Sequence, residues 1–335
     1  MTQASALIDA SRSTRLSSSV AAEQCKSLTQ AEVTPERPVR GYAAAMRGVG
    51  LLVVATLLAV AAVSLLSGRD SDSDGTARPS SSAAVVWALG DAADGSTASR
   101  QLADMIDDQR VDRLLYLGDV YGSSEFRDGT RQAFEEHYDP LYGELARETA
   151  PTPGNHEWPQ RDGAYDDYWR TAGGRSAEHA YAFDLAGWEI VSLNSQEELG
   201  RGSQQEGWLR SELTEPGTCR IVFMHRPRFS AGRHGDQPDL QAVWEAMRGR
   251  AVIFLAGHDH NLQRLHPVDG ITQFVAGAGG ANHYELHDDE RLAFGDAKST
   301  GALRLELRPG RADYAFVDAG GRRVDGGSLT CRPLG

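Results

Sequence analysis

The chain has 335 residues, of which 40% are hydrophobic and 24% charged, so it is long enough to form one large globular core. Its formal net charge is −13, and residues 1–47 carry six basic and four acidic side chains, which leaves −15 on the remainder. This charge argues against a nucleic acid as a partner, because a protein needs a basic face to bind a phosphate backbone. A small phosphorylated substrate remains compatible with it.

The N-terminal part of the sequence changes character abruptly. Residues 1–47 are polar and lack periodicity, which predicts a disordered cytoplasmic tail. Residues 48–68 carry no charge and are long enough to cross a hydrocarbon core of roughly 30 Å as one transmembrane helix. Arginines precede this run and aspartates follow it, so the positive-inside rule places the rest of the chain outside the cell membrane. A cleaved signal peptide beginning at Met46 is the alternative, and either interpretation exports the domain.

Residues 69–83 are rich in Ser, Asp and Gly and predict a solvated linker. From residue 84 to 335, apolar runs alternate with segments of helical spacing, which indicates one α/β domain. The predicted strands are 84–89, 114–117, 181–185, 188–194, 220–224, 251–256, 272–275, 302–307 and 313–317. The predicted helices are 98–108, 131–136, 165–170, 206–213 and 240–247.

Three cysteines are present, and two of them fall in the α/β domain. Cys25 belongs to the polar tail, whereas Cys219 enters a predicted strand and Cys331 lies near the end of the chain. Two cysteines in an exported domain suit one disulfide, although the sequence does not show that their Cα atoms approach each other. We expect Cys219 and Cys331 to pair.

The segment Leu255–Asn261 reads Leu-Ala-Gly-His-Asp-His-Asn and follows an apolar strand. Imidazole is the commonest protein ligand of first-row divalent metals, and Gly257 permits a turn tight enough for His258 and His260 to converge. A lone His-x-His would more often be a solvated loop. Four further motifs at strand ends favour the metal-binding interpretation.

These four motifs are Gly90-Asp91, Gly118-Asp119, Gly154-Asn155-His156-Glu157 and Val222–His225. Each lies at the carboxyl end of a strand or in the following loop, which is the edge where open α/β sheets build their sites. Spacing alone permits a shared site without establishing one. In order and residue type, the five motifs resemble the calcineurin-like metallophosphoesterase superfamily, and within it the purple-acid-phosphatase-like branch. The resemblance covers residues 85–275.

The resemblance implies a four-layer α/β/β/α sandwich of the metallophosphatase type and a centre of two metal ions. It assigns Asp119 as the carboxylate that bridges both ions. The remaining ligands would be Asp91 and His260 for one ion, and Asn155, His225 and His258 for the other. Mixed carboxylate, amide and imidazole ligands suit Fe, Mn or Zn. Two such ions, roughly 3.5–4 Å apart, can share a hydroxide and hold the phosphoryl oxygens for in-line attack.

The resemblance also assigns residues that would act on the substrate. His156 matches the catalytic histidine of the family, which stabilises the transition state or protonates the leaving group. His234 is assigned as a second catalytic histidine, and Arg226 and Arg233 as substrate-binding residues at the mouth of the site. Solvated surface charge is the alternative for these last three.

The sequence departs from the superfamily at the first metal. The usual motif is Asp-x-His, and Ala93 stands where that histidine belongs. Purple acid phosphatases replace the histidine with a tyrosine three residues after the bridging Asp, whereas this chain has Tyr121 two residues after it. Either Tyr121 reaches the first metal through a local change in backbone path, or Tyr121 packs without ligating and that metal has fewer ligands.

The sequence therefore predicts an exported, membrane-anchored phosphoester hydrolase that depends on two metal ions, with phosphomonoesters as its substrates. A phosphodiesterase or nucleotidase of the same superfamily is one alternative, because contacts to the leaving group lie in variable loops. A metal-binding surface module without catalysis is the other, and Ala93 is the residue that motivates it.

Overall fold

The computed structural model describes residues 83–174 and 179–333. The predicted tail, the apolar run at 48–68 and all but the last residue of the predicted linker lie outside these ranges. Within the described ranges, no helix is both long and apolar enough to cross a bilayer. The transmembrane helix therefore stays a prediction.

The strands form two sheets. The six-stranded sheet has the order β13-β12-β11-β1-β2-β3, and the seven-stranded sheet has the order β10-β8-β9-β7-β6-β5-β4. Their bounds are β1 Ala84–Leu89, β2 Arg113–Tyr116, β3 Thr149–Pro151, β4 Tyr181–Leu185, β5 Trp188–Ser192, β6 Arg220–Phe223, β7 Ile253–Ala256, β8 Leu262–Leu265, β9 Thr272–Ala276, β10 Leu292–Asp296, β11 Gly301–Arg308, β12 Arg311–Asp318 and β13 Arg323–Thr330. The strands β1, β2 and β3 are parallel, as are β5, β6, β7 and β9.

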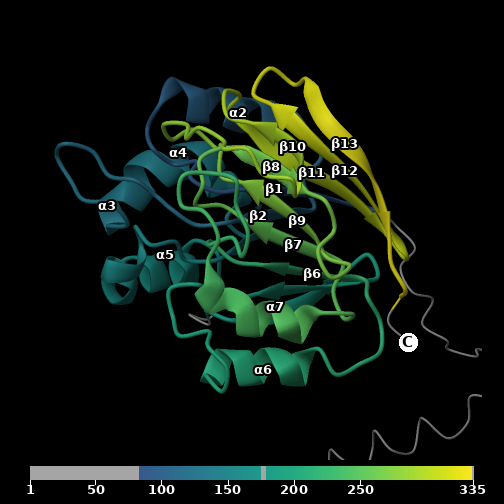
Figure 1. Ribbon diagram of the computed structural model, residues 1–335. Coiled ribbons are helices and arrows are strands. Elements are labelled where there is room, and N and C mark those ends of the chain that lie inside the picture. The colour runs from purple at the N-terminus through teal and green to yellow at the C-terminus, as the bar shows by residue number, and fades with distance from the viewer. Residues whose placement is uncertain (1–82, 175–178, 334–335) are drawn as a thin grey trace, which may run out of the picture. The chain divides into compact units, whose positions relative to one another are not determined.

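Helices cover the outer face of each sheet. Their bounds are α2 Thr97–Asp107, α3 Arg131–Ala133, α4 Asp139–Tyr142, α5 Tyr165–Thr171, α6 Gln204–Glu212 and α7 Gln241–Met247. A π-helical turn, Phe134–Tyr138, joins α3 to α4, and 3-10 turns lie at Gly143–Leu145, Trp158–Gly163 and Pro238–Leu240. Aromatic and aliphatic side chains of α2, α4 and α5 pack on the six-stranded sheet, and those of α6 and α7 pack on the seven-stranded sheet. Figure 1 shows α6 and α7 together, apart from α2 and α4.

The central strands are apolar along their whole length because both of their faces are buried. In β1, Val86 and Ala88 point into the core between the sheets, whereas Trp87 points into the core beneath the helices. In β7, Leu255 points into the core between the sheets, and Phe254 points into the core beneath the helices. The result is the predicted four-layer α/β/β/α sandwich.

All the strands and helices predicted after residue 83 are present, within a few residues at their ends. Strands β3, β8, β10 and β13 were not predicted from the sequence. Strand β3 has only three residues and ends in proline, and β13 is mostly exposed and contains Gly326 and Gly327. Both lack the apolar pattern on which strand prediction depends. Strand β8 begins directly after the His-Asp-His-Asn segment and has only four residues, so no separate strand was predicted there.

The predicted Cys219–Cys331 disulfide is confirmed, with the Cα atoms 4.9 Å apart. Cys219 directly precedes β6 of the seven-stranded sheet, and Cys331 directly follows β13 of the six-stranded sheet. The disulfide therefore joins the two sheets covalently.

Candidate metal centre

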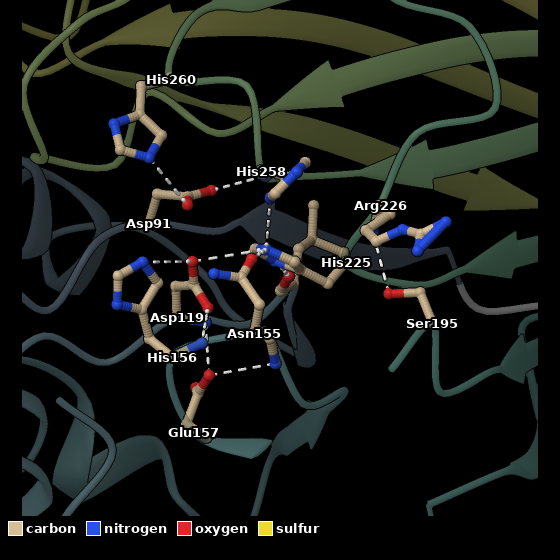
Figure 2. A network of polar contacts seen from close by, with 12 residues as sticks. Asp91, Asp119, Asn155, His156, Glu157, Ser195, His225, Arg226, His258 and His260 are labelled. Atoms are coloured by element: carbon tan, nitrogen blue, oxygen red, sulfur yellow. Dashed lines mark hydrogen bonds and ion pairs between the residues drawn. The ribbon is translucent and has the colours of Figure 1, made fainter. Parts of the chain in front are cut away.

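The polar motifs of both sheets meet at one edge of the sandwich, where the parallel strands end. Asp91 follows β1, Asp119 follows β2, and Asn155 lies in the loop after β3. Two residues of the opposite sheet face them, namely His225 after β6 and His258 after β7. Figure 2 shows these side chains, with His260, pointing toward a common centre.

Unusual backbone conformations aim several of these side chains. Asp91, Asp119 and His258 have φ values of 57°, 68° and 69°, in the left-handed region that non-glycine residues seldom adopt. Such conformations cost on the order of 1–3 kcal/mol each and concentrate at functional sites. Gly118 has φ 94°, and a Cβ there would lie 2.7 Å from Gly154 N and 2.8 Å from His225 Nδ1. Only glycine permits these loops to approach so closely.

The first group of potential ligands surrounds the Tyr121 hydroxyl. This oxygen lies 3.0 Å from Asp91 Oδ1, 3.3 Å from Asp119 Oδ2 and 3.0 Å from His260 Nε2. His260 Nε2 is 3.2 Å from Asp91 Oδ1. Although Tyr121 is one position earlier than the family pattern, its side chain reaches the first group.

The second group surrounds the Nε2 atom of His225. It lies 3.0 Å from both Asn155 Oδ1 and His258 Nδ1, and 3.3 Å from Asp119 Oδ2. Ligand atoms of Asp119, His225 and His258 all lie within 4.8 Å of one another. Asp119 Oδ2 is therefore close to both groups, which is the position that a bridging carboxylate requires.

The hydrogen bonds of the imidazoles leave lone pairs facing the centre. His225 Nδ1 donates to the carbonyl of Leu117, and His260 Nδ1 donates to the carbonyl of Asn282, each at 2.8 Å. With Nδ1 as donor in the neutral ring, Nε2 carries a lone pair. These lone pairs face carboxylate and amide oxygens, which are also electron-pair donors. Donor atoms that converge in this way, with backbone carbonyls fixing the rings, suit a metal ion.

Without metal, the close packing of these side chains shifts the pKa values of Asp119, His225 and His258. Burial raises the pKa of Asp119, but His225 and His156 outweigh it and hold that pKa below its ordinary value. Burial lowers the pKa of His225, yet Asp119 raises it to about 9. Burial and the neighbouring histidines lower the pKa of His258 to about 2. In the metal-free centre, the His225 ring therefore carries a proton on Nε2 as well as on Nδ1, and a bound metal would displace the proton on Nε2.

His156 lies beside the centre, on the solvent side. Its Nδ1 pairs with Asp128, and its Nε2 is 3.7 Å from Asp119 Oδ2. The side chain is 33% exposed, so a substrate can reach it. A cavity of about 560 Å³ opens next to it, lined by Ser123, Ser124, Glu125, Phe126, Arg127, Asp128, Asn155, His156, Pro159 and Gln160.

Two of the three other predicted substrate-contacting residues lie at the rim of the centre. The His234 ring stacks on His258 with centroids 3.9 Å apart. The Arg233 guanidinium lies 5.0 Å from the centroid of Tyr284, which itself stacks on His260 at 4.0 Å.

Arg226 is placed differently. Its guanidinium pairs with Asp239, and in Figure 2 it points away from the centre. The structure therefore brings His234 and Arg233 to the predicted site but not the charged group of Arg226.

Three acidic residues near the centre were given no role by the sequence analysis. Asp128 pairs with His156, buried Asp259 accepts hydrogen bonds from His234, and buried Glu157 accepts the backbone N–H groups of Asp119 and Gly154 at 3.0 Å each. Glu157 and Asp259 lie inside the motifs, so an acidic residue in a turn expected to be buried could have indicated a supporting role for each. Nothing in the sequence pattern distinguishes Asp128.

A family model described as calcineurin-like phosphoesterase matches residues 84–262, just over half of the chain. The chain belongs to this family. Tartrate-resistant acid phosphatase type 5 of Mus musculus is 21% identical over 286 residues, which cover 70% of this chain and 84% of that protein. A probable purple acid phosphatase 20 of Arabidopsis thaliana is 26% identical over 167 residues, which cover 41% of this chain and 39% of that protein. The chain lies in the purple-acid-phosphatase-like branch and is a metal-dependent phosphoric ester hydrolase.

Solved structures share the fold. A purple acid phosphatase from seeds of yellow lupin (Lupinus luteus) matches with a TM-score of 0.57 and 17% identity, over 75% of this chain. The match covers 54% of the lupin enzyme, so this chain spans about half of its length. The anchor protein of the inner membrane complex of Plasmodium matches with a TM-score of 0.59 and 16% identity, over 75% of this chain and 90% of that one. At such identities these structures support the fold alone.

Proposed function

We propose that this chain is an exported phosphomonoesterase that uses two metal ions, drawn from Fe, Mn or Zn. The observation that carries the proposal is the position of Asp119 Oδ2, within 3.3 Å of both Tyr121 Oη and His225 Nε2. A carboxylate oxygen shared by two groups of ligands fits a dinuclear centre. One metal would be held by Asp91, Asp119, Tyr121 and His260, and the other by Asp119, Asn155, His225 and His258.

Tyr121 takes the place of the histidine that the superfamily has where this chain has Ala93. The Tyr121 backbone N–H donates to the Ala93 carbonyl at 2.8 Å, and Ala93 forms a parallel bridge with Val120. This pairing, together with the left-handed backbone at Asp119, directs the phenol between Asp91 and His260. The first metal therefore has four protein ligands available, which favours an enzyme over a non-catalytic binding module.

Metal ions in such a centre, when bound, neutralise phosphoryl charge and lower the pKa of a coordinated water. The chain's own residues supply the other parts of the reaction. With its Nδ1 held by Asp128, His156 presents Nε2 beside the metal ligands, where it can donate a proton to the leaving oxygen or a hydrogen bond to the transition state. Arg233 adds positive charge at the rim for an anionic ester.

We also propose that the domain is exported from the cytoplasm. The uncharged run at 48–68 has the length of a membrane anchor or of a signal segment, and the Cys219–Cys331 disulfide is typical of proteins outside the cytoplasm. We place the hydrolase domain on the outer side of the cell membrane, or free outside the cell if the segment is cleaved.

The test is hydrolysis by the full chain after its metal is removed and then restored. We expect p-nitrophenyl phosphate to be hydrolysed by the loaded protein, not by the stripped protein, and faster than bis(p-nitrophenyl) phosphate. His266→Ala, a change at an exposed histidine outside the centre, should retain activity. Full activity in protein that elemental analysis shows to be metal-free would overturn the proposal. Faster diester hydrolysis would identify a phosphodiesterase, and no hydrolysis with two metals bound would identify a binding module.

His156→Ala tests the role of this histidine separately. We expect kcat to fall on the order of 10²–10³-fold, because a transition-state donor or general acid is lost. The loss should be smallest for esters with good leaving groups if His156 protonates the leaving oxygen. Equal losses across leaving groups would indicate stabilisation of the transition-state charge instead.

A further inference from the structure

A buried polar network lies behind His234 and consists of Asp259, Ser230 and Gln263. Asp259 and Gln263 are fully buried, and Ser230 is 5% exposed. Asp259 belongs to the turn between β7 and β8, Gln263 to β8, and Ser230 to the loop that carries His234. A carboxylate buried this deeply is costly unless its oxygens accept hydrogen bonds, so its partners indicate what it does.

Asp259 is bonded through both of its oxygens. Oδ1 is 3.0 Å from the backbone nitrogen of His234 and 3.0 Å from the ring Nδ1 of the same residue. Oδ2 accepts the hydroxyl proton of Ser230. One carboxylate therefore holds both the backbone and the ring of His234.

The hydrogen bonds of Ser230 explain why a carboxylate is needed here. The Ser230 hydroxyl oxygen already accepts from Gly232 N at 2.9 Å and from Gln263 Nε2 at 2.8 Å. Its own proton must then be donated, and Asp259 is the acceptor. An amide at position 259 would direct its NH₂ group either at Ser230 or at the two N–H groups of His234. Either orientation leaves a buried donor without an acceptor, which costs about 1–3 kcal/mol.

The surroundings of His234 leave one ring nitrogen for a substrate. Nδ1 is bonded to Asp259, one ring face is covered by His258, and Tyr284 approaches with centroids 5.4 Å apart at 70°. The side chain remains 32% exposed. We propose that Asp259 is a positioning residue: it fixes the Nδ1–H tautomer of His234 and orients Nε2, which can take up a proton and then donate it, or a hydrogen bond, to an oxygen of the phosphoryl ester. This inference rests on the proposed phosphatase function.

The direct test is the tautomer of His234, which needs no turnover. In the zinc-loaded, ¹⁵N-labelled full chain, at a pH where the ring is neutral, long-range ¹H–¹⁵N correlations should show the proton on Nδ1. His234→Gln assigns the signals. A proton on Nε2 would overturn the proposal, whether or not the protein hydrolyses phosphate esters. This experiment therefore separates failure of the inference from failure of the proposed function.

A double-mutant cycle supplies the second test, with p-nitrophenyl phosphate as substrate. Asp259→Asn should lower kcat by about 10–100-fold with little change in KM, because it acts through the orientation of His234. In a His234→Ala background, Asp259→Asn should cause almost no further loss, since residues that act as one unit are not additive. An equal fall in kcat in the wild-type and His234→Ala backgrounds would contradict the proposal. The same holds if Asp259→Asn lowers kcat because it releases metal. Ser230→Ala, which leaves both His234 contacts intact, should cost much less than Asp259→Asn.

Discussion

The two sheets contribute different chemistry to the centre. Within the described residues, the oxygen donors come from the six-stranded sheet, on the loops after β1, β2 and β3, and the imidazoles come from the seven-stranded sheet, after β6 and β7. The two sets also hold each other in place. His225 donates to the carbonyl of Leu117, and the backbone N–H of His258 donates to Asp91 Oδ2 at 2.8 Å. Neither sheet alone holds a metal site, so metal binding is coupled to the packing of one sheet on the other.

Asp119→Asn should have the largest effect, because it removes the negative charge of the carboxylate that both groups of ligands share and favours an NH₂ group in the place of Oδ2. We expect both metals to be lost and activity to fall by at least about 10³-fold, since each metal contributes several kcal/mol to the transition state. Elemental analysis and hydrolysis of p-nitrophenyl phosphate measure the two losses. Retention of two metals per chain would mean that Asp119 is not the bridge.

Asn155→Ala should remove an oxygen from the second metal only. Occupancy should fall toward one metal per chain, with activity down on the order of 10²-fold and partly restored by excess metal. The matched control is His156→Ala, the adjacent change, which should keep both metals because the imidazole acts on the substrate. If His156→Ala loses metal as Asn155→Ala does, the roles assigned in this turn are wrong.

Tyr121→Phe tests the oxygen donor that replaces the missing histidine. In protein loaded with ferric ion, a phenolate ligand gives a visible charge-transfer band, and the substitution should abolish that band while the circular dichroism stays unchanged. We expect metal affinity to fall by about 10–100-fold. A colourless, iron-free protein with full activity would show that Tyr121 packs beside the centre without binding metal.

The smallest expected effect is a pH dependence of the metal-free protein. The folded-state pKa of His225 is raised from 6.5 to about 9, so its contribution to stability is complete below pH 6.5 and is lost as the pH rises through 9. The free energy of unfolding should fall by up to about 1.4 kcal/mol per pH unit across this window. Asp119 has a lowered pKa, so its contribution is lost only in acid. Chemical denaturation at several pH values measures the slope, which His225→Gln should remove.

Much of the fold follows from local sequence patterns, whereas the assignment of ligands depended on the resemblance of the five motifs to a known family. Strands β1 and β7 are apolar because both faces are buried, and the ligands follow directly at the strand ends. The contribution of Tyr121 was undecided, because its direction depends on the backbone at Asp119 and on the bridge between Ala93 and Val120. The charged group of Arg226 was expected at the mouth of the site and instead pairs with Asp239, 13 residues away. Contacts of this kind depend on how loops cross each other, which no local pattern encodes.

The disulfide links the residue just before β6 to the residue just after β13. The proposed ligands lie between residues 91 and 260, so none of them is near Cys331 in the sequence. A protease that removed residues 331–335 would therefore break the covalent link between the two sheets and leave every proposed ligand in the chain.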